Sequence, residues 1–374
     1  MTIGQICSIV GGGTPDTNNK EYWNGGIQWF TPSEVGKEKY VSDSNRTISI
    51  DGLRNSSAKL LPPYSILLSS RATVGECSIN LKECCTNQGF QSAVPNSSIT
   101  STEFLYYRLL THKRDFIKKA CGSTFLEISA KQISKLNTCI PAKPEQKKVA
   151  DLLSLIDERI TIQNKVIEKY ESLIKALCNH LFSVGRNDVR RISDLGEYFS
   201  TMNLSKGDLS ISGEECVLYG ELFTTYGRVI NEIKSRTKAT DGAVRSHNND
   251  LLFPASTTVD ALSLISPAAI TKGGVVLGGD MFGIRVQPNL DNRYLSYLLY
   301  YCYRERFAGY AQGSTIIHLH YNDIKNIEIR IHDNATQKRI AHLLSILETM
   351  KANQEKALSF YSIQKAFLLK ELFI

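Results

Sequence analysis

Several signals of common protein classes are missing from this chain of 374 residues. No run of eighteen apolar residues occurs, so we predict no membrane span. The first residues, MTIGQICSIVGGGTP, lack a basic segment followed by an apolar core, so we expect no signal peptide and a cytoplasmic protein. The nine cysteines form no C-x-x-C pair, which favours free thiols over disulfides or a zinc site.

The chain also lacks a long basic tail, although its formal net charge is +7. Residues 1–144 contain 16 basic and 11 acidic residues, a surplus of +5, whereas residues 186–320 contain 14 of each. A positive balance is compatible with a nucleic-acid partner but does not require one. Any nucleic-acid site must therefore be built locally, within folded domains.

Motifs of common enzyme sites are incomplete. The segment LLPPYS (60–65) resembles the Asn/Asp/Ser-Pro-Pro-aromatic motif of amino-methyltransferases, but Leu61 cannot accept a hydrogen bond from an adenine amino group. We interpret its prolines as a turn before a strand. GGGTP (11–15) lacks the ending of a phosphate-binding loop, and VVLGGD (275–280) indicates a strand and a turn. His318 and His320 alternate on a predicted strand, where surface packing is favoured over a metal pair. We therefore expect no catalytic residue, no metal and no cofactor.

What the sequence does contain is a long internal repeat. CGSTFLEISAKQISKLNTCIPAKPEQKKVADLLSLIDERI (121–160) and QGSTIIHLHYNDIKNIEIRIHDNATQKRIAHLLSILETMK (312–351) share the same order of motifs. Gln146 and Gln337, and likewise Phe182 and Phe373, are each 191 residues apart. Upstream, residues 3–9, 66–76 and 94–110 match residues 192–198, 250–260 and 287–302 only faintly. A period this long indicates a duplicated domain with its connector, since solenoid repeats are much shorter.

The repeated connectors are predicted to be long helices. Residues 145–182 contain no glycine or proline, and Pro144 precedes them, where proline suits a helix start. Apolar residues recur at alternating steps of four and three, which indicates a coiled-coil seam rather than the wider apolar face of a surface helix. Gln163 interrupts the first seam and Gln354 the equivalent position of the second, a pairing that can fix register. The seam positions are Val149, Leu153, Ile156, Ile160, Ile167, Tyr170, Ile174, Leu177 and Leu181 in the first helix, and Ile340, Leu344, Leu347, Lys351, Leu358, Tyr361, Lys365, Leu368 and Leu372 in the second.

These features predict an α+β fold with two duplicated globular domains separated by two long antiparallel coiled-coil helices, related by a pseudo-two-fold axis. The predicted parts are a first domain (1–144), a connector helix (145–185), a second domain (186–335) and a C-terminal helix (336–374). Each helix of about 38 residues would span roughly 57 Å. A shared frame with divergent loops suits a protein that reads two different targets, and a two-fold arrangement suits duplex DNA.

Four motifs, in this order, resemble the specificity subunit of type I DNA restriction-modification enzymes. They are GGGTPDTNNKEYWNGGIQWFTPSEV (11–35), ILLSSRATVGECSI (66–79), TNQGFQS (86–92) and the connector IPAKPEQKKVADLLSLIDERI (140–160). The four motifs lie in the first half of the chain. Because the second half repeats the same order of segments, the resemblance covers nearly the full length of the chain. The second domain departs from the pattern, with YFSTMN (198–203) in place of the glycine-rich opening and FPASTTVD (253–260) in place of SSRATVGE.

The resemblance implies a DNA-binding subunit of a restriction system, a phage defence, with one target-recognition domain for each half of a split sequence. It implies that the connectors hold the halves apart and bind two DNA methyltransferase subunits, that motor-nuclease restriction subunits join for cleavage, and that this subunit is itself non-catalytic. Double-stranded DNA and these subunits are thus the expected partners.

Side-chain chemistry indicates which residues could contact DNA, since Lys and Arg suit phosphates and Arg, Lys, Asn or Gln suit base edges. In the first domain the candidates are Lys20, Arg46, Arg54, Lys59, Arg71, Gln88 and Gln91. In the second they are Arg228, Lys234, Arg236, Lys238, Arg245 and His247, from a segment (227–247) with five basic and two acidic residues. Trp23 and Trp29 could stack on bases, but packing within the framework is favoured.

Two other functions are compatible with the sequence. A fused methyltransferase or nuclease is opposed by the missing motifs, and methyl transfer by the isolated chain would support it. A coiled-coil adaptor for proteins alone would bind no DNA, which a mobility-shift assay with the methyltransferase partner would reveal.

Overall fold

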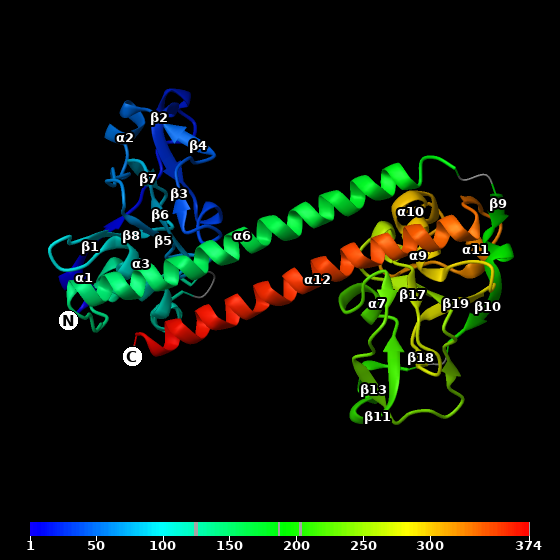
Figure 1. The fold of residues 1–374 in the computed structure, drawn as a ribbon. Coiled ribbons are helices and arrows are strands. Elements are labelled where there is room, and N and C mark those ends of the chain that lie inside the picture. Colours follow the sequence, from blue (N-terminus) through cyan, green and yellow to red (C-terminus); the bar gives the residue numbers. More distant parts are fainter. Residues whose placement is uncertain (123–125, 186–187, 202–203, 374) are drawn as a thin grey trace. The chain divides into compact units, whose positions relative to one another are not determined.

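The computed structural model describes residues 1–122, 126–185, 188–201 and 204–373. These residues pack as two units, of which unit 1 comprises residues 1–162 with 358–374 and unit 2 comprises residues 163–357. Both long helices, α6 (Lys143–Leu181) and α12 (Asn334–Glu371), contribute a segment to each unit (Figure 1). The division into four consecutive parts stays a prediction. Ser123 and Thr124 of the first Gly-Ser-Thr copy, and Met202 and Asn203, lie outside the described residues.

Unit 1 is built on two sheets. The larger sheet has the strand order β1 (Cys7–Gly11), β8 (Gln91–Pro95), β5 (Ile66–Leu68), β6 (Cys77–Asn80) and β3 (Tyr40–Val41). The smaller sheet has the order β4 (Arg46–Ile48), β2 (Trp23–Phe30) and β7 (Cys84–Thr86). The helices are α1 (Ile3–Ile6), α2 (Ile50–Arg54), α3 (Thr102–Thr111), α4 (Lys113–Lys119) and α5 (Ala130–Ser134), and the 3-10 turns are Lys20–Tyr22 and Pro32–Glu34.

Unit 2 repeats this plan. Its larger sheet has the order β10 (Gly196–Ser200), β19 (Met281–Val286), β15 (Asp250–Pro254), β17 (Ala268–Ile270) and β12 (Val229–Ile230). Its smaller sheet has the order β13 (Ser235–Thr237), β11 (Leu209–Leu218), β18 (Val276–Gly278) and β14 (Val244–Arg245). Two ribbons pair β16 (Ser256–Thr257) with β20 (Ile317–His318), and β9 (Asp188–Arg191) with β21 (Glu328–Ile331). The helices are α7 (Glu221–Thr224), α8 (Ala261–Leu264), α9 (Asn292–Cys302), α10 (Arg304–Ala308) and α11 (Tyr321–Ile324), with 3-10 turns at Ile192–Leu195 and Lys206–Asp208.

The strand pairings confirm the predicted duplication. The edge pairs β1–β8 and β10–β19 are both antiparallel, and β3–β6 and β12–β17 are both parallel. In the smaller sheets, β2 and β11 each run parallel to one neighbour and antiparallel to the other. The faint sequence matches thus lie on equivalent elements, because β5 corresponds to β15 and α3 to α9. Among the described residues, no helix has an apolar stretch long enough to span a membrane.

In each unit, the C-terminal end of one long helix packs against a helix of the globular part. In unit 2, Phe182 at the end of α6 packs edge-on against Tyr294 of α9, with ring centroids 5.5 Å apart. In unit 1, Phe373 packs against Phe104 of α3 at 5.2 Å. The guanidinium of Arg108 also donates a 2.6 Å hydrogen bond to the Phe373 carbonyl oxygen. The equivalence of Phe182 and Phe373 in the repeat therefore reflects the same packing role in both units.

The helices meet along the predicted seam, antiparallel to each other within each unit. Leu153 and Ile156 in unit 1, and Ile174 and Leu344 in unit 2, are buried. The amide nitrogen of Gln163 donates a 2.7 Å hydrogen bond to Oε1 of Gln354, as the matched polar positions predicted. The lysines of the second seam reach carboxylates on α6: Lys365 Nζ is 2.6 Å from Asp157 in unit 1, and Lys351 Nζ is 2.9 Å from Glu171 in unit 2.

A tyrosine–carboxylate pair joins each globular part to its own long helix. In unit 1, the Tyr107 hydroxyl donates to Asp157 at 2.6 Å, and burial is the main reason that the pKa of Tyr107 is raised. In unit 2, the Tyr297 hydroxyl donates to Glu348 at 3.1 Å. Lys39 donates to the Tyr107 oxygen at 3.2 Å, and burial lowers the pKa of this lysine.

Glu348 gives a pH-dependent prediction. Burial raises the pKa of its carboxyl despite the opposing influence of Arg228, Tyr297 and Lys351. Because folding favours the protonated form, its contribution to stability is present below the ordinary pKa of glutamate and is lost as pH rises from there through the raised pKa of the folded protein. Glu348→Gln removes this cost, so its melting temperature is expected to exceed that of the wild type at pH 8, with a smaller difference at pH 4.

The matched control is Glu168→Gln, because Glu168 lies exposed on α6 within the same unit. Its melting temperature should follow that of the wild type at both pH values. An equal shift for Glu348→Gln at pH 4 and pH 8 would show that the buried charge is not the cause.

Candidate nucleic-acid interface

The predicted residues of unit 1 fall into two groups. Lys20, Arg46, Arg54 and Lys59 surround the smaller sheet, and all four are exposed. Arg46 lies in β4 with its guanidinium 3.6 Å from the Trp23 ring centroid and 5.5 Å from that of Trp29. The tryptophans are only 8% and 4% exposed and pack edge-on at 5.0 Å, which confirms the framework interpretation. Arg46 therefore covers an aromatic core and keeps one face toward solvent.

The second group brings three loops together. Gln88 accepts a hydrogen bond from the Thr14 hydroxyl, and the Ser70 amide donates to the Gly89 carbonyl at 2.8 Å. The glycine-rich opening fits closely here, because a Cβ on Gly12 would lie 2.0 Å from the Asn87 carbonyl oxygen. The motifs at 11–15, 66–79 and 86–92 thus form one continuous surface with Arg71 and Gln88 exposed.

Two candidates of this group are partly engaged by the protein. Arg71 Nε lies 3.5 Å from a Glu127 carboxylate oxygen, although both side chains are more than a third exposed. An exposed pair of this kind is worth little and can exchange partners. Gln91 lies in β8, half-buried beneath Gly11 rather than in a loop. Arg71 and Gln88 are therefore better placed for a ligand than Gln91.

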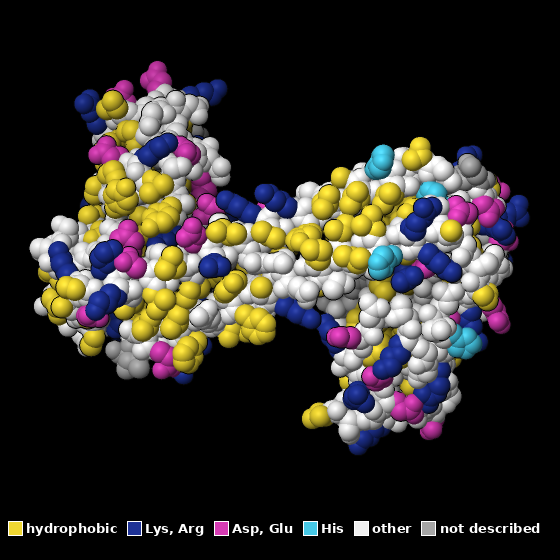
Figure 2. Space-filling model, viewed as in Figure 1, with side chains coloured by type: hydrophobic (Ala, Val, Ile, Leu, Met, Phe, Trp, Pro, Cys, Tyr) yellow, Lys and Arg dark blue, Asp and Glu magenta, His cyan; other side chains and the backbone are white. Residues whose placement is uncertain are grey.

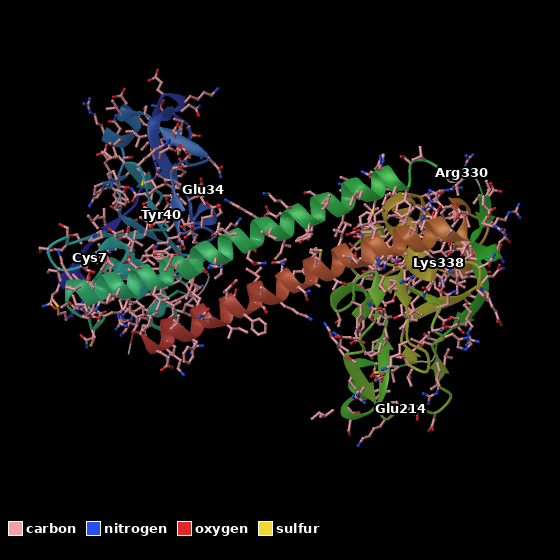
Figure 3. The ribbon with its side chains drawn as sticks, in the orientation of Figure 1. Cys7, Glu34, Tyr40, Glu214, Arg330 and Lys338 are labelled. Carbon is pink, nitrogen blue, oxygen red and sulfur yellow. The ribbon has the colours of Figure 1, made fainter. Side chains whose placement is uncertain are left out.

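In unit 2 the predicted basic residues gather on the smaller sheet, and acidic side chains accompany them. Arg245 forms a bidentate pair with Glu214, while Arg236 and Lys272 both approach Glu215, at 3.9 and 2.6 Å. Figure 2 shows Lys and Arg mixed with Asp and Glu at this end of the unit, where Figure 3 labels Glu214. This surface is therefore charged but not strongly positive.

The remaining candidates of unit 2 differ in exposure. Lys234, Lys238 and His247 are exposed, and the two lysines make no ion pair within the described part of the chain. Arg228 is instead buried, at 8% exposure, because its guanidinium donates to the Pro267 carbonyl at 2.8 Å and the Ser266 hydroxyl at 2.7 Å and lies 4.2 Å from the Tyr300 ring centroid. It immediately precedes β12, as Lys39 precedes β3. We therefore leave Arg228 out of the proposed interface.

A positive surface that the sequence motifs did not indicate lies on α4 and α5 of unit 1. Residues 113–135 include six basic and two acidic residues. The acidic residues are already paired, Asp115 with His112 at 3.0 Å and Glu127 with Arg71. The exposed cations that form no ion pair among the described residues are Arg114, Lys118, Lys119, Lys131 and Lys135. We call these five residues the α4–α5 cationic surface.

This surface adjoins the loop that holds Arg71. The Ile128 amide donates to the Ser70 carbonyl at 3.1 Å, and the Gln132 side chain donates to the Lys119 carbonyl at 2.7 Å. Lys113, at the start of α4, pairs with Glu76 at the end of the same loop. Arg71, α4 and α5 therefore form one side of unit 1. The local charge count was the signal in the sequence that could have identified it.

The equivalent side of unit 2 carries no such surplus. Arg304 of α10 donates to the Leu262 carbonyl at 2.8 Å, and Arg306 donates to the Glu328 carbonyl at 2.9 Å. His318 ends β20, whereas His320 precedes α11 instead of continuing the strand, and their rings stack at 5.9 Å. The two units thus share a frame but present different chemistry at the same place.

These observations define a class of protein in which one recognition frame occurs twice with different surfaces. A family described as the type I restriction modification DNA specificity domain matches residues 1–172 and again residues 186–359. The chain belongs to this family and carries its domain twice.

Individual relatives agree with this assignment. The MjaIX specificity subunit of Methanocaldococcus jannaschii is 35% identical over 174 residues, covering 45% of this chain and 40% of that relative. The HindI specificity subunit of Haemophilus influenzae is 26% identical over 181 residues, covering 46% and 39%. The matches therefore span less than half the length of these type I restriction enzyme subunits.

Solved structures share the fold. The type I restriction-modification S subunit from M. genitalium has a TM-score of 0.68 at 17% identity, covering 100% of this chain and 95% of that one. A chain from a study of complex assembly and conformational transition of the type I R-M system has a TM-score of 0.58 at 14% identity, covering 99% and 96%. At these identities the likeness concerns the fold alone.

Proposed function

We propose that this chain is the DNA specificity subunit of a type I restriction-modification enzyme. Its first target-recognition domain reads one half of a split DNA sequence and its second reads the other half. The supporting observation is the duplication itself: the two larger sheets have the same strand order, while the loops and charges on them differ. One frame with two surfaces suits a target with two unequal halves.

In this proposal the chain binds and orients DNA but performs no chemistry on it. The segment nearest to a methyltransferase motif supports this role, because Leu61 is only 1% exposed and packs in the core beside Leu67 and Phe90. Pro63 and Tyr64 form a turn before β5, and the position that holds Asn, Asp or Ser in the methyltransferase motif is occupied by a leucine, whose side chain cannot accept a hydrogen bond from a flipped adenine. Methyl transfer by the purified chain alone would contradict this part of the proposal.

We also propose that the long helices bind two methyltransferase subunits, which in turn allow the restriction subunits to join. Exposed apolar pairs support two equivalent docking sites. Leu152 and Leu155 of α6 are 43% and 61% exposed, and their counterparts Leu343 and Ile346 of α12 are 41% and 44% exposed. Figure 2 shows hydrophobic side chains along these helices. Repeated apolar positions outside the seam are typical of sites that a partner helix covers.

The modular test replaces residues 190–320 with the equivalent segment of a relative that has a different target. Because the larger sheets share their strand order, the hybrid is expected to fold and to assemble with the methyltransferase. One half of the methylated motif should change and the other half should stay the same, as read from the methylated bases of cells expressing the complex.

The reciprocal exchange of residues 1–120 is the control, and it should change only the other half. If either exchange alters both halves together, the two domains do not read DNA independently. If the complex methylates no specific motif although it assembles, the chain is not a specificity subunit.

A further inference from the structure

A segment of strand β11 leaves its sheet at the outer end of unit 2. Leu209 and Glu214 are both opposite Thr237 of β13, so the four residues between them have no partner in the ladder. These residues, Ser210 to Gly213, form what we call the β11 bulge. Ile211 lies within it and is 102% exposed, although the residues that continue β11, Cys216 to Leu218, are buried.

The protein holds this bulge in a fixed shape. Gly213 has φ +124°, and a Cβ there would lie 2.2 Å from the Thr237 carbonyl oxygen, so glycine is needed at this position. The Arg236 guanidinium donates to the Gly213 carbonyl at 3.0 Å, and the Thr237 hydroxyl donates to the Asp208 carbonyl at 2.8 Å. The bulge is thus anchored on both sides, while the side chain of Ile211 is exposed to solvent. β-bulges commonly redirect a side chain in this way.

Unit 1 has a bulge at the equivalent place. Trp23 and Ile27 of β2 are both opposite Ile48 of β4, which leaves Asn24, Gly25 and Gly26 outside the ladder. Asn24 has φ +59° and is exposed, and a Cβ on Gly26 would meet nothing within 4 Å. The same strand therefore projects in both units, with an amide side chain in one and an apolar side chain in the other.

We propose that these bulges enter a groove of the DNA and that Ile211 contacts the C5-methyl group of a thymine in its half-site. The inference rests on the proposed function and names one residue that determines specificity. Lys238 flanks the bulge without an ion pair among the described residues and can contact a phosphate, whereas Arg236 and Arg245 are engaged by Glu215 and Glu214. The isoleucine itself offers no hydrogen bond. A protruding apolar side chain distinguishes thymine by its methyl group, which no other standard base carries in the major groove.

The position of Asn24 agrees with this reading of the two bulges. An asparagine side chain can bond both N6 and N7 of adenine, whereas an isoleucine side chain can only cover an apolar group. The two units would therefore recognise different bases through equivalent bulges, in β2 of unit 1 and in β11 of unit 2. Direct contact also explains why a fully exposed isoleucine is held on a rigid bulge, where it adds nothing to the folded core.

The test measures the binding of the assembled methyltransferase complex to a duplex that carries its own methylated motif. Each thymine of the half-site assigned to residues 190–320 by the domain exchange is replaced by deoxyuridine, which removes only the methyl group. For one thymine, the wild-type complex is expected to bind about fourfold more weakly, the equivalent of one buried methyl group. Ile211→Ala should bind the thymine duplex about fourfold more weakly and distinguish it from the deoxyuridine duplex by less than about 1.5-fold.

Asn24→Ala is the matched control, since it alters the equivalent bulge of the other unit. It should keep the full fourfold effect of deoxyuridine in the Ile211 half-site. The proposal is overturned if Ile211→Ala remains as sensitive to every deoxyuridine as the wild type, or if this half-site contains no A·T pair. Specific binding of the wild-type complex shows that such a failure concerns Ile211 alone and not the proposed function.

Discussion

Replacing Lys118, Lys119 and Lys131 with glutamine is expected to weaken DNA binding by the assembled complex about a hundredfold at roughly 0.15 M salt. These residues belong to the α4–α5 cationic surface and are exposed without an ion pair among the described residues. Each phosphate contact releases about one counterion, so losing three contacts should lower the slope of log affinity against log salt by roughly 2.7. Fluorescence anisotropy with labelled duplex over a range of salt concentrations measures both quantities.

The loss should be similar for specific and unrelated DNA, because phosphate contacts carry no sequence information. The control variant replaces Lys165, Lys169 and Lys175 of α6, which removes the same formal charge from exposed positions on a helix of unit 2. An unchanged salt slope for the first variant would remove the α4–α5 surface from the DNA interface. Impaired assembly with the methyltransferase would instead identify this surface as a protein contact.

The repeat allowed much of the fold to be predicted because it preserves residues with paired structural roles. Gln163 and Gln354 interrupt the two seams at equivalent positions, and they bond each other in the structure. Phe182 and Phe373 are equivalent in sequence, and each packs on an aromatic residue of α9 or α3. Such residues stand at equivalent positions in the two copies because each lies on or next to a long helix. The rise per residue of a helix is fixed, so the number of residues sets where each side chain lies.

The candidate interface was harder to predict because side-chain type does not determine exposure. Arg228 lies in a basic segment, yet the Pro267 carbonyl and the Ser266 hydroxyl hold it in the core. The exposure of Ile211 could not be predicted because the bulge depends on the register between β11 and β13, which the sequence does not reveal. The two bulges, Asn-Gly-Gly in unit 1 and Ser-Ile-Ser-Gly in unit 2, also differ in length. Their equivalence is therefore visible only from how β2 and β11 pair with their neighbouring strands.

The two glutamines near the starts of the long helices show which repeated residues are structural. Gln337 is 1% exposed, donates to the His332 carbonyl at 2.7 Å and accepts from the Asp291 amide at 3.1 Å. Gln146 is also 1% exposed and bonds the Pro141 carbonyl and the Ser101 amide in the same way. Asp291 caps α9 and Ser101 caps α3, so each glutamine fixes a long helix to the start of a domain helix.

Gln337→Leu is therefore expected to destabilise unit 2 by roughly 2–5 kcal/mol, because leucine has a similar size but leaves two buried backbone groups without a partner. The loss should appear as faster hydrogen exchange of the α9 amides, measured by mass spectrometry on the purified chain. Gln146→Leu should produce the same change in α3 of unit 1. Local exchange is the suitable measure since a chain of two units need not unfold in one step.

The neighbouring Lys338, labelled in Figure 3, supplies the control, because it is exposed on the same turn of α12. Lys338→Leu introduces the same side chain without removing a buried hydrogen bond, so exchange in α9 should stay within about twofold of the wild type. If Gln337→Leu also leaves α9 unchanged, the glutamine does not anchor the helix. If it loosens α3 as strongly as α9, the two units do not respond separately and the repeated glutamines act on the whole chain.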